Sequence, residues 1–426
     1  MSVFLLTMLA WFVLMIIGFP IYLSLGLVST AALIILNESL IIIPQKMFAS
    51  INSFVLLSVP LFILAGEFMN TGGVTKRIIN FSRAIVGHIP GGLGQVNVGA
   101  NLIITGISGV ALAEAAGIGK ILIPSMVKDG YSKVFAGCLT ATASTLGPLI
   151  PPSVPLILYA VIAQASSGKM LLGGFAPGIL TALVLMIYVY FYSKKQKQIK
   201  KTIFKFSNVV QEFKSSFFAL MAPFIIFYGL FAGVFVATEA AAALVIYVFI
   251  VSKFIYNEIS WTDLPKVFTS TAILTSKIAI ILCTAGIYNY LLTVQGVTQT
   301  VGEFVVSLTT NPKLFLIVFG LLVVILGCFL DGLAIMFLLV PIFLPIAVSL
   351  GIDPVHFGVV LVMALMLGLI TPPFGPAMFV VAEVGEISLN KLFSAIIPFV
   401  LALLVVLIII SVSPEIVMYL PEKFLG

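Results

Sequence analysis

The sequence predicts an all-α, polytopic membrane protein, and two observations carry that prediction. Of its 426 residues, 61% are hydrophobic and only 8% are charged, whereas a soluble globular chain is about a quarter charged. Two long apolar stretches, 140–155 and 365–376, each contain a glycine and a Pro-Pro pair. Proline lacks an N–H group and clashes with the preceding helical turn, so each stretch is expected to break a membrane helix.

The length of the chain limits the number of membrane crossings. Each crossing needs about 20 apolar residues, so there is room for roughly a dozen helices and some re-entrant pieces. Residues 2–45 predict one long or kinked helix, interrupted at residues 18–20, and then a short one. Residues 52–70 predict the next helix. Basic residues on an amphipathic pattern follow at 76–88, which favours a segment along the cytoplasmic surface.

Residues 91–128 predict a helical hairpin. Small residues dominate this stretch, and Gly106, Ser108 and Gly109 interrupt it midway, so each half is too short to cross the membrane alone. Non-helical backbone at that depth is tolerated only inside protein or along a cavity. We therefore expect a re-entrant hairpin with its tip near Ser108-Gly109, followed by a broken helix at 134–165.

The second half of the chain repeats this order. The densest basic run, 194–205, is expected in the cytoplasm because Lys and Arg accumulate in cytoplasmic loops. A second cytoplasmic loop is expected at 253–266, and a second hairpin is expected to have its tip near Leu330-Asp331-Gly332. The other expected elements are helices near 172–193, 216–233, 235–252 and 268–293, a hairpin near 311–347, a broken helix near 356–384 and a final helix near 392–420.

The two breaks align without a gap, in a register that we call the repeat register. With residues 194–205 in the cytoplasm, the first broken helix starts inside the cell and the second starts outside. Paired breaks in two halves of opposite topology indicate an inverted repeat, with the binding site of a secondary transporter at the breaks. The repeat register pairs Leu146-Gly147 with Leu367-Gly368, Pro151-Pro152 with Pro372-Pro373, Pro155 with Pro376, Gly106 with Gly327, Pro124 with Pro345, Gly130 with Gly351, Gly137 with Gly358 and Pro177 with Pro398.

The repeat predicts how the chain divides into scaffold and transport core. The core holds the hairpins and the broken helices, and the scaffold holds the uninterrupted helices. The expected parts are scaffold helices and a surface arm at 1–90, a first core repeat at 91–170, scaffold helices and a cytoplasmic loop at 171–293, a second core repeat at 311–385 and a C-terminal helix at 386–426.

A broken helix exposes unpaired carbonyls at the end of one fragment and unpaired N–H groups at the start of the next. Carbonyls with nearby hydroxyls suit a hard monovalent cation, and N-terminal helix ends favour an anionic group of a substrate. The second half offers Thr371, which aligns with Ile150, and Asp331 at the hairpin tip. The two sites are therefore expected to share backbone and to differ in side chains. The hydroxyls of the first half belong to Ser108, Thr142, Ser144, Thr145 and Ser153.

Two acidic residues stand out within the apolar segments. Asp331 lies in a span of about 40 uncharged residues, where a carboxylate costs about 2.5–3.5 kcal/mol on insertion scales and is functional by default. We expect it to be a cation ligand or a proton carrier, and the alternative is a hydrogen-bonded helix cap. Glu114 is expected to be structural, as a cap or as a partner of Lys120.

Other classes of function lack their signatures. The sequence has no GxSxG, HExxH or GxxxxGK[ST] motif, so it predicts neither an enzyme nor ATP hydrolysis by this chain. The net charge of +6 comes from basic residues in short loops, which set orientation and do not indicate nucleic acid. Cys138, Cys283 and Cys328 have no metal-binding spacing and are expected to be inert buried thiols.

Four motifs, in order along the chain, resemble one transporter family. They are GISGVALAEAAGIGKILIP, TASTLGPLIPPS, FLDGLAIMFLLVPIFLPIAVSLGIDPVHFGV and GLITPPFG. They resemble the large membrane subunit (DctM-like) of the tripartite ATP-independent periplasmic (TRAP) transporters, and the resemblance covers essentially the whole chain. One position departs from it. The first hairpin of this family often reads GxSGSAxAD, whereas this chain has Val110 and Glu114 there, which puts a role for a hydroxyl at residue 110 in doubt.

The resemblance implies a mechanism and partners that the spacing does not. Such subunits couple Na⁺ influx to uptake of an organic acid in the bacterial inner membrane by an elevator movement. The acid is delivered by a periplasmic binding protein, and a small four-helix membrane subunit, expected here as a separate chain, completes the transporter. Overall likeness favours the sialic acid type over C4-dicarboxylates, although no residue argues for it. The resemblance implies that one Na⁺ site is formed by Ser108, Gly109, Ser144, Thr145 and Gly147. It implies that a second Na⁺ site is formed by Asp331, Gly332, Gly368 and Thr371. The substrate carboxylate is expected near Ser108, Ser153, Pro152 and Pro373.

Three alternative functions make different demands on the sequence. The permease of an ATP-driven importer would need a coupling helix and no inverted repeat, and a channel would need a continuous polar pore lining. A single-component Na⁺- or H⁺-coupled anion carrier would have the same helices, so only dependence on a binding protein separates it from the tripartite interpretation.

Overall fold

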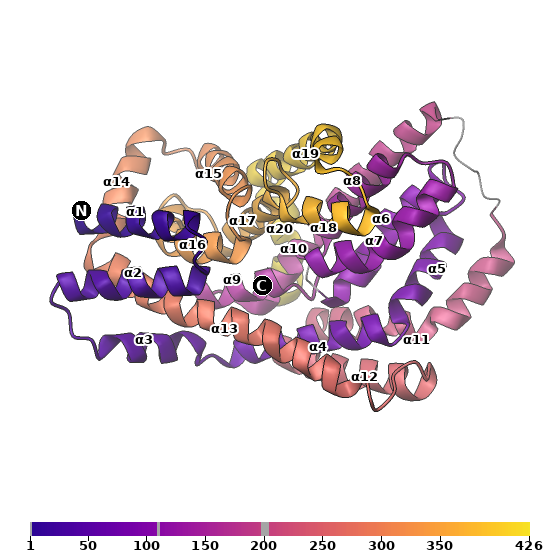
Figure 1. Ribbon diagram of the computed structural model, residues 1–426, viewed down its shortest axis with the longest axis horizontal. Coiled ribbons are helices and arrows are strands. Elements are labelled where there is room, and N and C mark those ends of the chain that lie inside the picture. Colours follow the sequence, from indigo (N-terminus) through magenta and orange to yellow (C-terminus); the bar gives the residue numbers. More distant parts are fainter. Residues whose placement is uncertain (1, 109–110, 197–203) are drawn as a thin grey trace.

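The computed structural model describes residues 2–108, 111–196 and 204–426, and all regular secondary structure within them is helical (Figure 1). The predicted fold class, an all-α protein, is therefore confirmed. The helices of the first half are α1 (Ser2–Ile16), α2 (Ile21–Ile35), α3 (Ile42–Ile51), α4 (Ser58–Thr71), α5 (Val74–Val86), α6 (Gly92–Ser108), α7 (Ala111–Lys128), α8 (Lys133–Ala143), α9 (Val154–Ile162) and α10 (Ser167–Lys195).

The second half adds ten helices among the described residues. They are α11 (Phe206–Phe231), α12 (Ala237–Ile250), α13 (Leu264–Val294), α14 (Val297–Leu308), α15 (Pro312–Gly327), α16 (Gly332–Ser349), α17 (Pro354–Gly368), α18 (Pro376–Gly385), α19 (Leu389–Val412) and α20 (Pro414–Leu425). A single π-helical turn at 251–255 prolongs α12.

Three element predictions need correction. Residues 2–35 form two helices, α1 and α2, that lie side by side (Figure 1), because Gly18 adopts φ +96° and Pro20 starts the next helix. Helix α14 was not predicted. The final helix is split in two, since Pro414 opens α20 as its first residue.

Seven helices of the described chain are long and apolar enough to cross a membrane, or eight if the bent pair α14–α15 counts as one span. This is fewer than the dozen that length allows, because much of the chain lies in shorter helices. The two predicted broken helices are examples: α8 and α9 flank the first break, and α17 and α18 flank the second.

The repeat register found in the sequence extends to the helices themselves. Shifted back in this register, α16 covers 111–128, which are the bounds of α7. Likewise α15 falls on 91–106, which is α6 within two residues at each end. Helix α14 falls on 76–87 and so matches the amphipathic α5. The peptide bonds Pro151-Pro152 and Pro372-Pro373, which occupy equivalent positions, are both cis.

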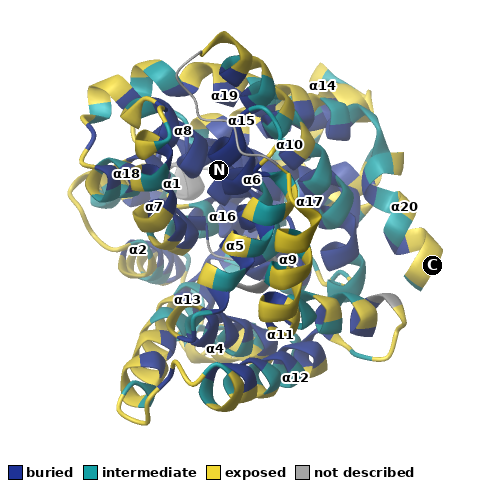
Figure 2. Cartoon of the chain, turned by 90° about the vertical axis from the view of Figure 1, so that its right-hand side faces the viewer, coloured by how far each residue is buried: buried dark blue, intermediate teal, exposed yellow. Residues whose placement is uncertain are grey.

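The broken helices form the centre of the molecule. Helix α17 is buried from Val355 to Gly368, and α8 is buried from Phe135 to Ala143. Exposed residues concentrate on outer helices such as α13 (Figure 2). The two halves also join directly, because the Tyr159 hydroxyl of α9 donates a hydrogen bond to the Pro354 carbonyl at 2.6 Å. Its ring packs on Gly358, where a methyl group would come within 2.2 Å of a ring carbon.

Candidate functional site

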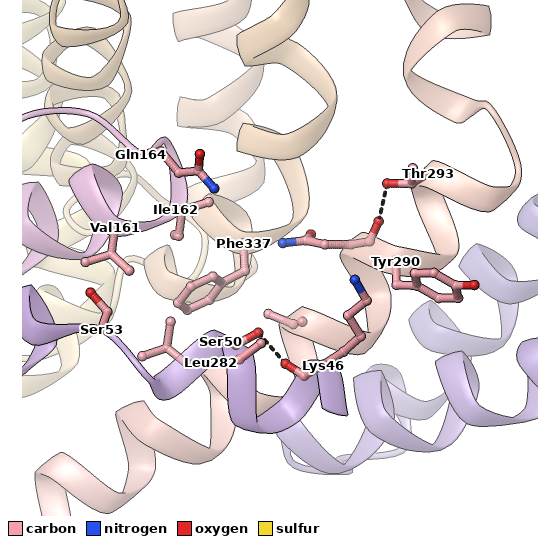
Figure 3. Close-up of a pocket in the computed structure, with 14 residues that line it drawn as sticks. Lys46, Ser50, Ser53, Val161, Ile162, Gln164, Leu282, Tyr290, Thr293 and Phe337 are labelled. Atoms are coloured by element: carbon pink, nitrogen blue, oxygen red, sulfur yellow. Dashed lines mark hydrogen bonds between the residues drawn. The ribbon is translucent and has the colours of Figure 1, made fainter. Parts of the chain in front are cut away.

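Two cavities lie along α13. The larger, about 590 Å³, lies between α3 and α13 on one side and the ends of α9 and α16 on the other (Figure 3). The smaller, about 220 Å³, is lined in part by the two breaks and the second hairpin tip. We call the smaller one the central cavity. Its lining is Ala111, Leu112, Pro148, Val154, Pro155, Leu274, Ile278, Asp331, Gly332, Leu333, Met336, Leu365, Met366 and Leu369.

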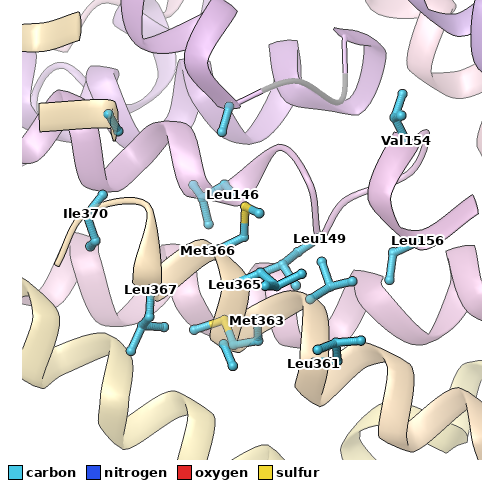
Figure 4. Packing of buried hydrophobic residues seen from close by; sticks show 14 of the residues in the cluster. Leu146, Leu149, Val154, Leu156, Leu361, Met363, Leu365, Met366, Leu367 and Ile370 are labelled. Carbon is cyan, nitrogen blue, oxygen red and sulfur yellow. The ribbon is translucent and has the colours of Figure 1, made fainter. Parts of the chain in front are cut away.

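The central cavity brings together elements that are far apart in sequence. Pro148 and Pro155 come from the first break, Asp331 from the second hairpin tip, and Leu365 from the second broken helix. Leucines and methionines of both broken helices belong to one buried cluster (Figure 4). Among the described residues, parts of both breaks and of the second hairpin tip therefore line one cavity.

The first break presents hydroxyl oxygens that are buried. Ser144 donates to the carbonyl of Ala141 at 2.9 Å, and Thr145 donates to the carbonyl of Thr142 at 2.7 Å. Both residues are almost completely buried. Because each hydroxyl donates its proton to a carbonyl, its oxygen lone pairs remain available to a cation.

Glu114 lies against the same break. A methyl group on Gly147 would come within 2.7 Å of Oε2 of Glu114, so the backbone of the break lies directly against this carboxylate. Glu114 is 4% exposed, whereas Lys120, its expected partner, is exposed. The acid that the sequence favoured as a structural residue thus lies beside the predicted cation-binding backbone.

The second break is held by a contact between two glycine backbones. A methyl group on Gly368 would come within 2.6 Å of the Gly327 Cα atom, which places the end of α17 directly on the end of α15. Thr371 follows, and its hydroxyl donates to the carbonyl of Leu367 at 2.7 Å. Like the hydroxyls of Ser144 and Thr145, the Thr371 hydroxyl donates its proton to a backbone carbonyl and keeps its oxygen lone pairs available.

Asp331 forms the helix cap that the sequence analysis gave as the alternative, and it also lines a cavity. It caps α16, because its Oδ1 accepts a hydrogen bond from the N–H of Leu333 at 2.9 Å. It also lines the central cavity, and among the described residues it is the only ionisable one in that lining. Gly332, the first residue of α16, lines the cavity beside it.

None of the described residues predicted to hold a substrate carboxylate lines the central cavity. Ser153 is buried and caps α9 by accepting the Leu156 N–H at 3.2 Å, while its hydroxyl donates to the Pro148 carbonyl. Pro152 is buried and Pro373 is exposed. Ser108 ends α6, but its side chain and the whole of Gly109 lie outside the described residues.

A buried amide pair was not identified from the sequence. Asn97 of α6 donates from Nδ2 to Thr140 Oγ1 of α8 at 2.7 Å, and Asn101 donates to Oδ1 of Asn97 at 2.9 Å. The two amides thereby fasten the first hairpin to the first broken helix. Their spacing of four residues on one face of a small-residue helix is the signal that could have identified them.

No group of three or more His, Cys, Asp or Glu side chains within the described chain could hold a metal ion. The apolar helices and the repeated breaks define the class of protein as a membrane transporter.

The comparisons with known proteins give the family. The chain belongs to the DctM component of the tripartite ATP-independent periplasmic transporters, whose description matches residues 8–416. It is therefore a multi-pass membrane protein of a transport family, as predicted.

Individual members of this family are similar to the chain in sequence over most of their length. The chain is 38% identical to the sialic acid TRAP transporter large permease protein SiaM of Vibrio cholerae serotype O1, over 98% of both chains. It is 36% identical to the C4-dicarboxylate TRAP transporter large permease protein DctM of Pseudomonas aeruginosa, over 94% of both chains. The fold is similar to that of the YdaH transporter of Alcanivorax borkumensis, with a TM-score of 0.61 and 14% identity, covering 87% of each chain.

Proposed function

We propose that this chain is the permease that carries an organic acid across the bacterial inner membrane, driven by Na⁺ influx. The observation that carries the proposal is the central cavity, where both breaks and the second hairpin tip meet around one carboxylate. The family supports transport of a small organic acid by a three-part system. The partners are a small membrane subunit and a periplasmic substrate-binding protein.

The charge of the central cavity supports coupling to a cation. Its one ionisable lining residue, Asp331, is an acid and would repel a substrate carboxylate. A cation beside Asp331 removes that repulsion, so ion and substrate bind together better than either binds alone. Na⁺ supplies this positive charge when it is bound.

The residues at both breaks fit Na⁺ as ligands. Ser144 and Thr145 in the first break, and Thr371 in the second, direct their protons at carbonyls and keep oxygen lone pairs free. The proposed ligands are Ser108, Gly109, Ser144, Thr145 and Gly147 at the first site, and Asp331, Gly332, Gly368 and Thr371 at the second.

The substrate carboxylate is proposed to bind at the helix ends that open from the breaks. Helix α9 starts at Val154 and α18 starts at Pro376, and the positive end of each helix dipole favours an anion. Ser153, Pro152 and Pro373 lie next to these helix starts. The substrates printed in the names of relatives, sialic acid, C4-dicarboxylates and isethionate, are all anions and form the panel to test.

An elevator movement is favoured by how α13 meets the core. This scaffold helix contributes only Leu274 and Ile278 to the central cavity, and both are apolar. The remaining lining residues belong to the hairpins and broken helices. A site carried almost wholly by one body, and closed by two apolar side chains of another, can slide with its contents.

The test is uptake of labelled acids into proteoliposomes that hold this chain and its small subunit. Uptake is measured with and without an inward Na⁺ gradient, and with and without the cognate binding protein. A requirement for both supports the proposal. Uptake that ignores the binding protein would move the chain to the single-component carriers, and uptake that ignores Na⁺ would refute the assignment of the breaks.

A further inference from the structure

The larger of the two cavities along α13, which we call the access cavity, contains a positive charge that the proposed mechanism does not use. Lys46 of α3 is the only ionisable residue in its lining besides the phenol of Tyr290. The rest of the wall supplies hydroxyls, amides and apolar groups: Ala49, Ser50, Ser53, Val161, Ile162, Gln164, Leu282, Ala285, Gly286, Asn289, Thr293 and Phe337 (Figure 3).

The ammonium of Lys46 is held in place without being neutralised. It lies 5.1 Å from the centre of the Tyr290 ring, in cation–π contact. The nearby acid, Glu38, accepts a hydrogen bond from the Tyr290 hydroxyl at 3.1 Å. Among the described residues, no carboxylate lies within ion-pair distance of Lys46.

The backbone beneath Lys46 is closely packed. Ser50 donates a hydrogen bond to the Lys46 carbonyl at 2.8 Å. Ser50 also packs on Gly286 of α13 so closely that a methyl group there would come within 1.9 Å of its oxygen. Lys46 is therefore fixed to the same helix that closes the central cavity.

The access cavity also offers a buried acceptor. The side-chain oxygen of Asn289 is buried and has no hydrogen-bond partner among the described residues. A buried carbonyl oxygen without a donor is unfavourable, so a ligand hydroxyl or N–H would be stabilised there. A cation and a free acceptor in one cavity suit a hydroxylated or amide-bearing carboxylate.

The two cavities follow each other along α13. The central cavity meets this helix at Leu274 and Ile278, and the access cavity meets it from Leu282 to Thr293. At 1.5 Å per residue, Ile278 and Asn289 are about 16 Å apart along the axis. In the proposed orientation the access cavity lies toward the periplasm, where the positive-inside rule makes a lysine uncommon.

We propose that the access cavity is the first binding site of the substrate on its way in, and that Lys46 binds its carboxylate before it passes to the breaks. This inference rests on the proposed function. It makes Lys46 a residue for substrate capture, whereas the residues of the breaks couple the substrate to the ion.

The test compares uptake kinetics of Lys46→Gln, Lys46→Arg and the control Lys277→Gln in proteoliposomes with the small subunit and binding protein. Lys277 is an exposed lysine of α13 and lines neither cavity. We expect Lys46→Gln to raise the KM for substrate about tenfold, with the maximal rate and the Na⁺ concentration for half-maximal uptake unchanged. Lys46→Arg should stay near wild type, because it keeps the charge, and so should Lys277→Gln.

A second measurement distinguishes an effect of the substitution on substrate capture from an effect on protein stability. The thermal unfolding of each purified variant should match wild type, since Lys46 is exposed, and Lys46→Glu should raise KM further than Lys46→Gln does. An unchanged KM in both neutral and acidic variants would overturn the access site and leave the proposed function intact. Wild-type uptake without dependence on Na⁺ and binding protein would refute the proposed function itself.

Discussion

The contact between Gly327 and Gly368 allows a direct test of the second break. In Gly368→Ala, the new methyl group would lie 2.6 Å from the Gly327 Cα atom and 2.8 Å from its carbonyl carbon. Both atoms are backbone, so no flexible side chain can move aside. Overpacking of this kind costs about 1–3 kcal/mol, and the ends of α15 and α17 must separate.

Separating the ends of α15 and α17 is expected to weaken Na⁺ binding more than substrate binding. Thr371 and the carbonyl of Gly368 lie directly at the end of α17, and the Thr371 N–H donates to that carbonyl at 3.2 Å. We expect the Na⁺ concentration for half-maximal uptake to rise about tenfold or more, since each step of about 1.4 kcal/mol is a factor of ten. The assay is uptake at increasing Na⁺, with thermal unfolding measured in parallel.

The matched control is Gly320→Ala on α15. Its methyl group would meet only the side chain of Leu407, at 3.4 Å, which is ordinary contact. This variant should keep wild-type stability and Na⁺ dependence. If Gly368→Ala also behaved as wild type in both measurements, the close backbone contact, and with it the assignment of the second break, would be refuted.

Three further substitutions test the hydroxyl and amide contacts. Thr371→Val keeps the side-chain shape and removes a proposed Na⁺ ligand, so half-maximal uptake should need about tenfold more Na⁺; unchanged Na⁺ dependence would remove Thr371 from the site. Tyr159→Phe loses the bond to Pro354 and should lower unfolding stability by about 0.5–1.5 kcal/mol, with the KM for substrate unchanged; a changed KM would place Tyr159 in the substrate path. Asn97→Leu breaks the buried bond to Thr140 and should cost about 1–3 kcal/mol in thermal unfolding; full stability would show that the amides do not fasten the hairpin.

The breaks could be predicted because proline and glycine act locally. The Pro-Pro pairs and the repeat register mark both broken helices from residue types alone, and the helix bounds agree with them. The same register, applied to the basic amphipathic segment at 76–88, would have predicted α14. That helix was missed because Thr298, Gln299 and Glu303 give it no long apolar run.

The surroundings of the breaks could not be predicted in the same way, because they depend on contacts between distant segments. Nothing near Glu114 in the sequence shows that it packs on Gly147, which belongs to a later helix break. The position of Lys46 likewise has meaning only once α3 lies on α13. The sequence supplies the polar groups of such a protein, and the packing decides which of them share a cavity.

The packing also shows why two halves with one repeated pattern need not act alike. The first break rests on α10, where Gly174 and Gly178 admit its backbone so closely that a methyl group on Gly174 would come within 2.2 Å of the Leu149 carbonyl oxygen. The equivalent positions of α19 are Ala395 and Phe399, which leave no such groove. The second break rests instead on the hairpin of its own half, through Gly327. The two breaks therefore have different supports, α10 for the first and α15 for the second, although their sequences repeat.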